Sequence, residues 1–308
     1  IILVVCLFPV YAESADRYVT NSGNDASNNC TNSASPCATI GHAANEAVSG
    51  DTVKVAHGIY YENIDLENST LNPLIFQGGW NTDFSVRNED PSLTVVNGGG
   101  VDHVFYITSY GASDFTIQGF TITNGGDVSS GGGICFYVNN AAGAMSVTLT
   151  GNIIINNSAN AGGGGLHVQA QSGSSLTLDA QKNIIMGNET GTGGGAAVNI
   201  SAYSSDVVDV TLKNNIIADN AKNHPGFALL IYTYEAQCTV DLINNTITKN
   251  NYTSTSGGIK LISSGSAAIT QLNSINNIIW GNSGYDLYIQ PFDSISTAEV
   301  NARYSDIG

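Results

Sequence analysis

One six-residue phrase occurs six times in this chain, and it limits the possible folds more than any other feature. The copies read GFTITN, NIIINN, NIIMGN, NIIADN, NTITKN and NIIWGN, and they close on Asn124, Asn157, Asn188, Asn220, Asn250 and Asn282. Successive closing asparagines lie 33, 31, 32, 30 and 32 residues apart. A near-constant period of this length indicates a solenoid in which each copy belongs to one stacked unit.

Glycine clusters and alternating apolar runs follow most copies of the phrase. One cluster spans residues 162–165, and alternating runs such as VTLTG, LTLDA and VDVTL begin at Val147, Leu176 and Val208. Alternation with a period of two indicates short strands that bury one face, and the glycines and asparagines indicate tight turns. Coils of short strands stack into a parallel β-helix, with neighbouring strands about 4.8 Å apart.

Equivalent positions of a β-helix lie above one another, so a residue that recurs once per coil forms a column. The first asparagine of each phrase recurs in this way, and we expect these asparagines to form a hydrogen-bonded ladder: Asn152, Asn183, Asn215, Asn245 and Asn277. An amide both donates and accepts hydrogen bonds, and asparagine tolerates the left-handed conformation that a sharp turn requires. This column is therefore interpreted as structural.

The first twelve residues have the features of a partial signal peptide. IILVVCLFPVYA is apolar, too short to span a bilayer, and ends in a small residue before Glu13. We therefore expect the mature protein to be secreted or displayed on the cell surface, although a buried first strand is an alternative. The last residues, EVNARYSDIG, read as the start of a further coil, so we expect the natural protein to continue.

The charge balance bears on the partners. The chain has 9 Lys plus Arg against 25 Asp plus Glu, for a formal net charge of -16. Such a charge repels nucleic acid and anionic lipid, which we exclude as partners. A glycan or a protein at the cell surface is the expected partner, and self-association is a further possibility.

The five cysteines fall into three groups. Cys6 lies in the expected signal peptide, and Cys30 and Cys37 flank a polar loop. In an exported protein that pair predicts a disulfide, because two thiols without further ligands do not make a zinc centre. Cys135 and Cys238 are expected to stay single and packed, although pairing is not excluded. We predict no metal site and no cofactor.

The segment from Arg17 to Gly100 differs from the repeats. RYVTNSGNDASNNC followed by SPCATIGHAANEAVSGDTVKVAHGIYYENI resembles the amino-terminal cap of secreted right-handed parallel β-helix proteins of the pectate-lyase-like superfamily. The resemblance implies a cap at residues 13–51, with a short helix near residues 39–48 that covers the open end of the core. The expected apolar face of this helix is Ile40, Ala43, Ala44, Ala47 and Val48.

The GGW at residues 78–80 is similar to an element of bacterial β-helix proteins. The glycine clusters with IxxN also resemble the polymorphic outer-membrane-protein repeat, GGA[ILV] with FxxN, although Ile replaces Phe. The fold class is therefore all-β: a single-stranded right-handed parallel β-helix solenoid with a short N-terminal capping helix. Residues 52–308 would supply eight or nine coils, and the resemblance implies a bacterial source.

Three acids are weak candidates for catalysis. Alternation places Asp179, Asp209 and Asp241 on the outer face of neighbouring coils. Paired outer-face acids carry out hydrolysis in glycoside hydrolases of the superfamily, but outward acids are also the ordinary solvated face of a strand. A lyase would need clustered acids for calcium and a basic residue, which the repeats lack.

Two outward columns after the glycine turns suggest a binding face. One is expected to hold Cys135, His167, Ala197, Ala228 and Lys260, and the other Tyr137, Gln169, Asn199, Leu230 and Ile262. Tyrosines and amides on a flat face suit neutral glycans or a protein partner. The weak binding candidates are Tyr137, Gln169, Asn199, Phe227, Tyr232 and Tyr234. His167 is interpreted as solvated.

The coil near Pro225 departs from the repeat, and the apolar run from Phe227 to Tyr234 is a candidate interface. Three readings of function follow from these patterns. The first is a non-catalytic extracellular or cell-surface scaffold for adhesion, glycan contact or assembly. The second is a polysaccharide-degrading enzyme, either a glycoside hydrolase or a lyase, and the third is the subunit of a self-associating filament.

Overall fold

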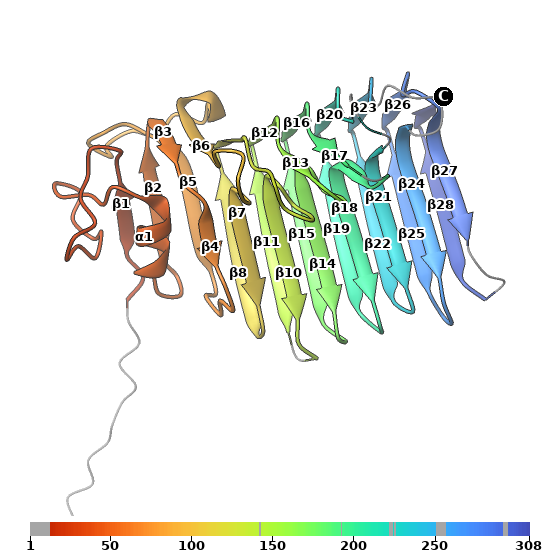
Figure 1. Ribbon diagram of the computed structural model, residues 1–308, viewed down its shortest axis with the longest axis horizontal. Coiled ribbons are helices and arrows are strands. Elements are labelled where there is room, and N and C mark those ends of the chain that lie inside the picture. The colour runs from red at the N-terminus through yellow and green to blue at the C-terminus, as the bar shows by residue number, and fades with distance from the viewer. Residues whose placement is uncertain are drawn as a thin grey trace, which may run out of the picture.

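The computed structural model describes residues 13–141, 143–191, 193–221, 224, 226–250, 257–291 and 295–308. The expected signal peptide at residues 1–12 and Pro225 lie outside these residues. The described chain is a parallel β-helix, and Figure 1 shows its strands stacked side by side from the red N-terminal cap to the blue C-terminal end. The described part contains no apolar helix of membrane-spanning length.

Three long parallel sheets make the walls of the β-helix, and each coil adds one strand to each wall. The ten-stranded sheet has mostly seven-residue strands. In spatial order they are β1 (Asp16–Val19), β2 (Thr52–Ala56), β5 (Leu74–Trp80), β8 (Ala112–Gln118), β11 (Ala144–Thr150), β15 (Ser175–Gln181), β19 (Val207–Lys213), β22 (Gln237–Ile243), β25 (Ile269–Ile275) and β28 (Thr297–Arg303).

The nine-stranded sheet contains the repeated phrase, and most of its strands have three residues. They are β3 (Gly58–Tyr61), β6 (Thr94–Asn97), β9 (Thr121–Thr123), β12 (Ile153–Ile155), β16 (Ile184–Met186), β20 (Ile216–Ala218), β23 (Thr246–Thr248), β26 (Ile278–Trp280) and β29 (Asp306–Ile307). The central residue of a strand points inward, as Ile154, Ile185 and Ile217 do, and is buried.

The eight-stranded sheet forms the third wall. Its strands are β4 (Ile64–Leu66), β7 (Phe105–Ser109), β10 (Ile134–Asn139), β14 (Leu166–Gln171), β18 (Gly195–Tyr203), β21 (Phe227–Tyr234), β24 (Gly257–Ser264) and β27 (Tyr285–Pro291). Between the second and third walls, two loops pair through β13 (Ser158–Ala159) and β17 (Glu189–Thr190). A 3-10 turn, η1 (Pro91–Leu93), lies before β6.

From the second copy of the repeated phrase onward, its first and closing asparagines form two buried columns, whereas Asn124, which closes the first copy, is exposed. In the first column each Oδ1 accepts from the backbone N and the Nδ2 of the preceding asparagine, as Asn215 does from Asn183 at 2.9 and 3.1 Å. Each Nδ2 also donates to a main-chain oxygen, as from Asn215 to Ala180 at 2.9 Å. The closing asparagines make a second column with the same pattern, Asn157, Asn188, Asn220, Asn250 and Asn282.

The expectation that the ladder asparagines themselves adopt the left-handed turn conformation is wrong. The positive φ does not belong to the ladder asparagines but to the residue before each of them. Lys182 before Asn183 and Asn214 before Asn215 have φ values of 55° and 56°. The ladder asparagine can therefore turn its amide inward, because its neighbour provides the sharp change of direction.

The cap closes the N-terminal end with a helix shorter than expected. Helix α1 (Ile40–Asn45) buries Ile40, Ala43 and Ala44, so these three members of the predicted apolar face are confirmed. The helix ends at Asn45, with Glu46 as its C-cap, rather than near Val48. Asp51 draws the following chain into a turn by accepting from the backbone N of Val48 at 2.9 Å.

Candidate functional site

The three candidate catalytic acids lie on the outer face of the ten-stranded sheet, but they do not form one constellation. Asp179 and Asp241 share a column with Thr211 between them, whereas Asp209 lies in the next outward column, beside Thr177 and Thr239. Asp179 accepts from Gln181 at 2.6 Å, and Asp241 accepts from Asn273 at 2.7 Å. Each of these two carboxylates is therefore hydrogen-bonded to the side-chain amide of a neighbouring residue, and not to the other acid.

The binding candidates belong to the eight-stranded sheet, where both expected columns are wrong at β18 and β21. Asn199 pairs with His167, not with Gln169, so the first column reads Tyr106, Cys135, His167, Asn199, Leu230, Lys260 and Tyr288. The second reads Thr108, Tyr137, Gln169, Ser201, Tyr232, Ile262 and Gln290. The cause is that Ala196 takes the place of a glycine in the turn, as the bond from the Gly165 N to its oxygen shows.

His167 is buried, so the prediction of a solvated side chain is wrong. Its Nδ1 accepts from Asn199 Nδ2 at 3.1 Å, and its Nε2 donates to Gln169 Oε1 at 3.0 Å. Burial lowers the pKa of His167 to about 4. The ring is therefore neutral near pH 7, and the hydrogen-bond partners select the tautomer protonated at Nε2.

The hydrogen bonds continue from His167 toward the tyrosine of a neighbouring coil. Gln169 Nε2 donates to Gln171 Oε1 at 3.4 Å, and Tyr137 Oη donates to the same oxygen at 2.7 Å. Asn199 also donates to Ser201 Oγ at 3.1 Å. This polar row fixes the orientation of side chains from three adjacent strands.

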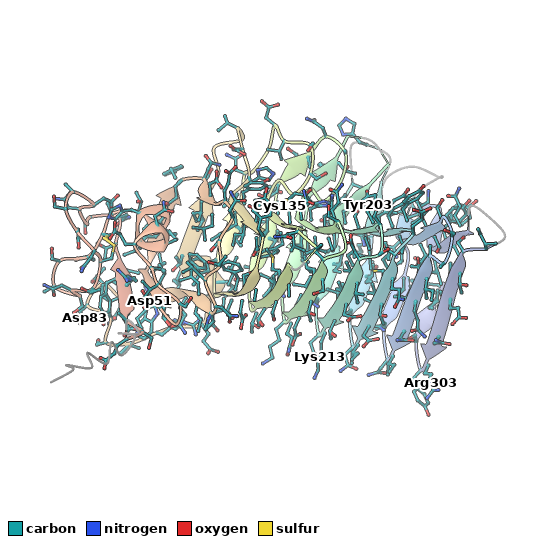
Figure 2. All side chains as sticks on the ribbon, turned by 90° about the horizontal axis from the view of Figure 1, so that it is seen from below. Asp51, Asp83, Cys135, Tyr203, Lys213 and Arg303 are labelled. Atoms are coloured by element: carbon teal, nitrogen blue, oxygen red, sulfur yellow. A yellow bond between two sulfur atoms is a disulfide. The ribbon has the colours of Figure 1, made fainter. Side chains whose placement is uncertain are left out.

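A pocket of about 220 Å³ lies over this row, and its walls come from the sheet and from the overlying loop. It is lined by His103, Tyr106, Ser129, Ser130, Cys135, Tyr137, His167 and Gln169. Figure 2 shows Cys135 and Tyr203 on the face from which the loops project, with Lys213 and Arg303 at the opposite edge. We call this pocket the groove.

His103 forms the end wall of the groove and is fixed on both sides. Its Nδ1 lies 2.9 Å from Asp102 Oδ1, its Nε2 lies 2.9 Å from the Ser130 main-chain oxygen, and its ring stacks on Tyr106 at 4.7 Å between ring centroids. Both ring nitrogens face oxygen atoms, so the orientation of the ring is fixed from two sides. Burial raises the pKa of Tyr106 to about 12, so its hydroxyl stays protonated.

An acidic pocket of about 190 Å³ adjoins the groove behind His103 and Tyr106. Asp65, Glu67 and Asp102 contribute its carboxylates. Burial raises the pKa of Asp65, and the nearby charges of Glu67 and Asp102 add to this effect, while His103 opposes it. The pocket therefore contains three carboxyl groups, one of which, Asp65, holds its proton more strongly than an ordinary aspartate does.

The remaining binding candidates lie away from the groove. Phe227, a binding candidate, is buried: its ring lies 5.4 Å from Lys260 Nζ and stacks on Tyr288 at 6.4 Å between ring centroids. Tyr232 contacts Tyr203 at 5.5 Å, and Tyr234 is exposed. The apolar run of β21 is a regular strand with three inward residues, Leu229, Ile231 and Thr233.

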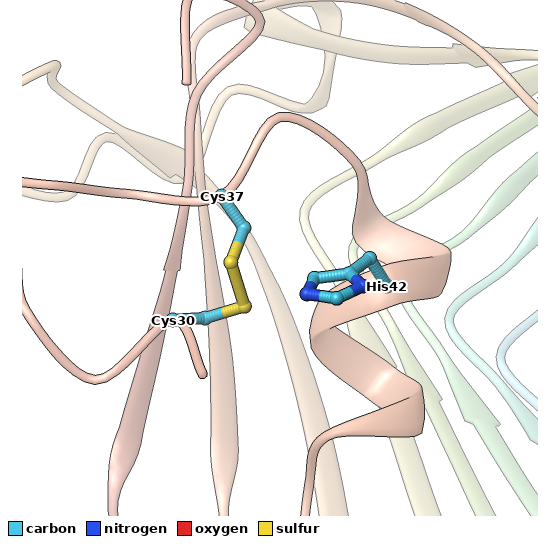
Figure 3. A group of neighbouring side chains, drawn as sticks. All are labelled: Cys30, Cys37 and His42. Atoms are coloured by element: carbon cyan, nitrogen blue, oxygen red, sulfur yellow. A yellow bond between two sulfur atoms is a disulfide. The ribbon is translucent and has the colours of Figure 1, made fainter. Parts of the chain in front are cut away.

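The four cysteines that the structure describes are either buried or joined in a disulfide. Cys135 and Cys238 are free and buried, and burial raises the pKa of each thiol to about 12. Cys30 and Cys37 are joined by a disulfide in the cap, with His42 beside it (Figure 3). These three side chains lie close enough to resemble a metal site, but both sulfurs are already bonded to each other and His42 Nε2 donates to the Asn28 oxygen at 2.7 Å.

Sequence reasoning missed five titratable residues of the groove and the acidic pocket: Asp65, Glu67, Asp102, His103 and Tyr106. All lie between the cap and the repeats, where the spacing is irregular. The pairing gives 41 residues from Asp65 to Tyr106 and 29 from Tyr106 to Cys135, against 32 from Cys135 to His167. The adjacent Asp-His pair was the one local signal that could have drawn attention to this segment.

Comparisons with known proteins bear on the fold. No family model matches the chain, and no curated protein matches it. The crystal structure of Escherichia coli ybhc matches with a TM-score of 0.53 and 11% identity over 94% of this chain and 81% of that one. A crystal structure of pectate lyase Pel9A matches with a TM-score of 0.47 and 12% identity over 97% of this chain and 80% of that one. At such low identity the likeness is one of fold alone: the chain is a parallel β-helix, as its resemblance to the pectate-lyase-like superfamily implies.

Proposed function

We propose that this protein is a non-catalytic extracellular or cell-surface β-helix that contacts neutral glycans through the groove. The polar row from Asn199 through His167 and Gln169 to Gln171 and Tyr137 carries this proposal. Amide, imidazole and phenol groups held in fixed orientations match the hydroxyl groups of a sugar, and the rings of Tyr106 and Tyr137 offer apolar surface to its C-H face.

The charges near the groove favour a neutral ligand. The chain carries a net charge of -16, and three carboxylates line the adjoining pocket. An anionic chain lying across the groove would meet these carboxylates and be repelled. The disulfide of the cap supports an exported location, because such bonds persist in oxidising compartments.

Titration calorimetry with neutral oligosaccharides tests the proposal. Gln169→Ala breaks the polar row and should weaken binding about tenfold, since a lost hydrogen bond of about 1.4 kcal/mol has that effect. Gln271→Ala is the matched control, because Gln271 is a half-buried outward glutamine on the ten-stranded sheet. Equal binding by both variants would contradict the assignment of the groove.

Glycoside hydrolysis is the second candidate, and the acidic pocket is the observation that favours it. A carboxyl group with a raised pKa, here Asp65, beside two other carboxyl groups suits an acid-base pair. Release of reducing ends from a bound oligosaccharide, lost in Asp65→Asn and in Asp102→Asn, would replace the non-catalytic proposal. Binding without turnover would retain it.

A further inference from the structure

A third pocket, of about 400 Å³, lies at the corner between the ten-stranded and nine-stranded sheets. The loop before η1 forms one wall, the turns after β8 and β11 form the floor, and the turn after β15 forms the far wall. Its lining includes two basic residues, Arg87 and Lys182, and one acid, Glu89, together with Gln118 and Thr150. It shares no lining residue with the groove.

Arg87 is held with its terminal nitrogens available. Its Nε donates to the Gly78 oxygen at 2.9 Å, which fixes the plane of the guanidinium. Its Nη1 has one loose ion pair, at 3.9 Å from a Glu89 carboxylate whose side chain is 89% exposed. A Cβ at Gly119, where φ is +77°, would lie 2.9 Å from Nη2, so the glycine makes room for the guanidinium.

Lys182 approaches from the opposite wall. It occupies the left-handed turn position before Asn183, with a φ of 55°, and is exposed. Its Nζ forms no ion pair or hydrogen bond with any described residue. Lys182 and Arg87 therefore both present positive charge to one pocket, and the loose ion pair with Glu89 neutralises little of it. The chain as a whole has 9 basic residues against 25 acids.

The neutral part of the lining has two chemical faces. Gln118 and Thr150 offer amide and hydroxyl groups, whereas Pro91, Ile153 and Ile184 offer apolar surface. A sugar ring has both kinds of surface, and a guanidinium with a nearby ammonium suits a carboxylate or a phosphate. We propose that this corner pocket binds a sugar-sized molecule carrying one anionic group, a site separate from the neutral-glycan groove.

The test is titration of the folded chain at low ionic strength with glucuronate, glucose 6-phosphate, glucose and inorganic phosphate. One of the two anionic sugars should bind. Binding of glucuronate would identify the anionic group as a carboxylate, and binding of glucose 6-phosphate would identify it as a phosphate. Glucose should bind much more weakly at this pocket. If inorganic phosphate binds as tightly as both sugars, the part of the proposal that concerns the sugar ring is overturned.

Three variants make the test specific. Lys182→Gln and Arg87→Gln should each weaken binding of the anionic sugar at least tenfold, and Glu89→Gln should strengthen it by removing a competing carboxylate. Lys249→Gln is the matched control, because Lys249 is also exposed at a left-handed turn, with a φ of 55°, but lies outside the pocket. Since Lys182 is exposed, its replacement reports on binding even if Arg87→Gln alters folding.

The outcomes separate this proposal from that for the groove. No binding of either anionic sugar, or equal losses in Lys182→Gln and Lys249→Gln, would overturn the corner site. Gln169→Ala should leave the anionic sugar bound as in the wild type. Failure of the neutral-glycan titration would therefore leave the corner site standing, and the reverse also holds.

Discussion

At the scale of single residues, burial gives His167 a role that its position in the sequence does not reveal. An outward position on a strand is normally solvated, but His167 is buried, and it lines the groove together with Ser129 and Ser130 of the neighbouring loop. The imidazole is neutral and is hydrogen-bonded to Asn199 and Gln169, so it orders the groove. A proton added to Nδ1 would remove the acceptor that Asn199 uses.

The lowered pKa of His167 predicts a loss of stability in acid. The folded pKa of about 4 lies below the usual value of about 6.5. Between these values the unfolded chain binds more protons than the folded chain, so the free energy of unfolding falls as the pH falls through this window. The shift corresponds to a loss of about 3 kcal/mol over the window.

Urea denaturation of the wild type and of His167→Gln at about pH 7 and about pH 4.5 measures this loss. The variant should lose less stability than the wild type on acidification. His224→Gln is the control, because His224 is exposed and its replacement should keep the wild-type response. Parallel pH responses of the wild type and His167→Gln would contradict the assignment.

At the scale of elements, the repeated phrase determines both the strands and the links between them. Each three-residue strand of the nine-stranded sheet is too short to be stable alone, and its core contact comes from one central residue such as Ile217. The asparagine columns on either side join each strand to the next coil. The sequence predicted the strands and the first column, because both repeat with the same period.

Replacing one ladder asparagine tests how much the column contributes. Asn215→Ala removes the acceptor used by the Asn183 N and Nδ2 and the donor used by Ala180 O and Asn245 Oδ1. Buried polar groups left without partners destabilise the folded state, here by about 3 kcal/mol. Chemical denaturation measures the change.

Asn301→Ala is the control for that experiment. Asn301 is exposed and donates a single bond to Asn273, at 3.2 Å, on the outer face of the ten-stranded sheet. Its replacement should change the free energy of unfolding by less than about 0.5 kcal/mol. A similar small effect for Asn215→Ala would mean that water satisfies the opened positions and that the column contributes little.

At the scale of the whole molecule, the fold was predictable to a greater extent than the candidate site. Period, alternation and turn residues specify a stack of coils, because every coil obeys the same local rules. The groove depends instead on side chains that differ between coils and on a register that irregular segments shift. Asn199 shows the difficulty: two alanines replace glycines in one turn, and counting from the glycine cluster therefore misplaces it by one column.

The excess of acids also acts on the whole molecule. The outward acids Asp179, Asp209 and Asp241 lie on adjacent coils of one sheet, within a chain of net charge -16. Like charges on a compact solenoid repel each other more than they do on an extended chain. This repulsion destabilises the folded state, and dissolved salt screens it over a distance of about 10 Å at 0.1 M.

We therefore expect sodium chloride to raise the thermal unfolding midpoint of this protein. Calorimetric scans at low and high salt measure the rise, which should amount to a few degrees. A change of about 1 kcal/mol in the free energy of unfolding shifts the midpoint of a domain larger than 150 residues by about 2–4 °C. The triple variant Asp179→Asn, Asp209→Asn, Asp241→Asn has less charge to screen, so it should start from a higher midpoint and gain less from salt. An unchanged or lower midpoint of the wild type in salt would show that local pairs, such as Asp51 with Arg17 in the cap, outweigh the general repulsion.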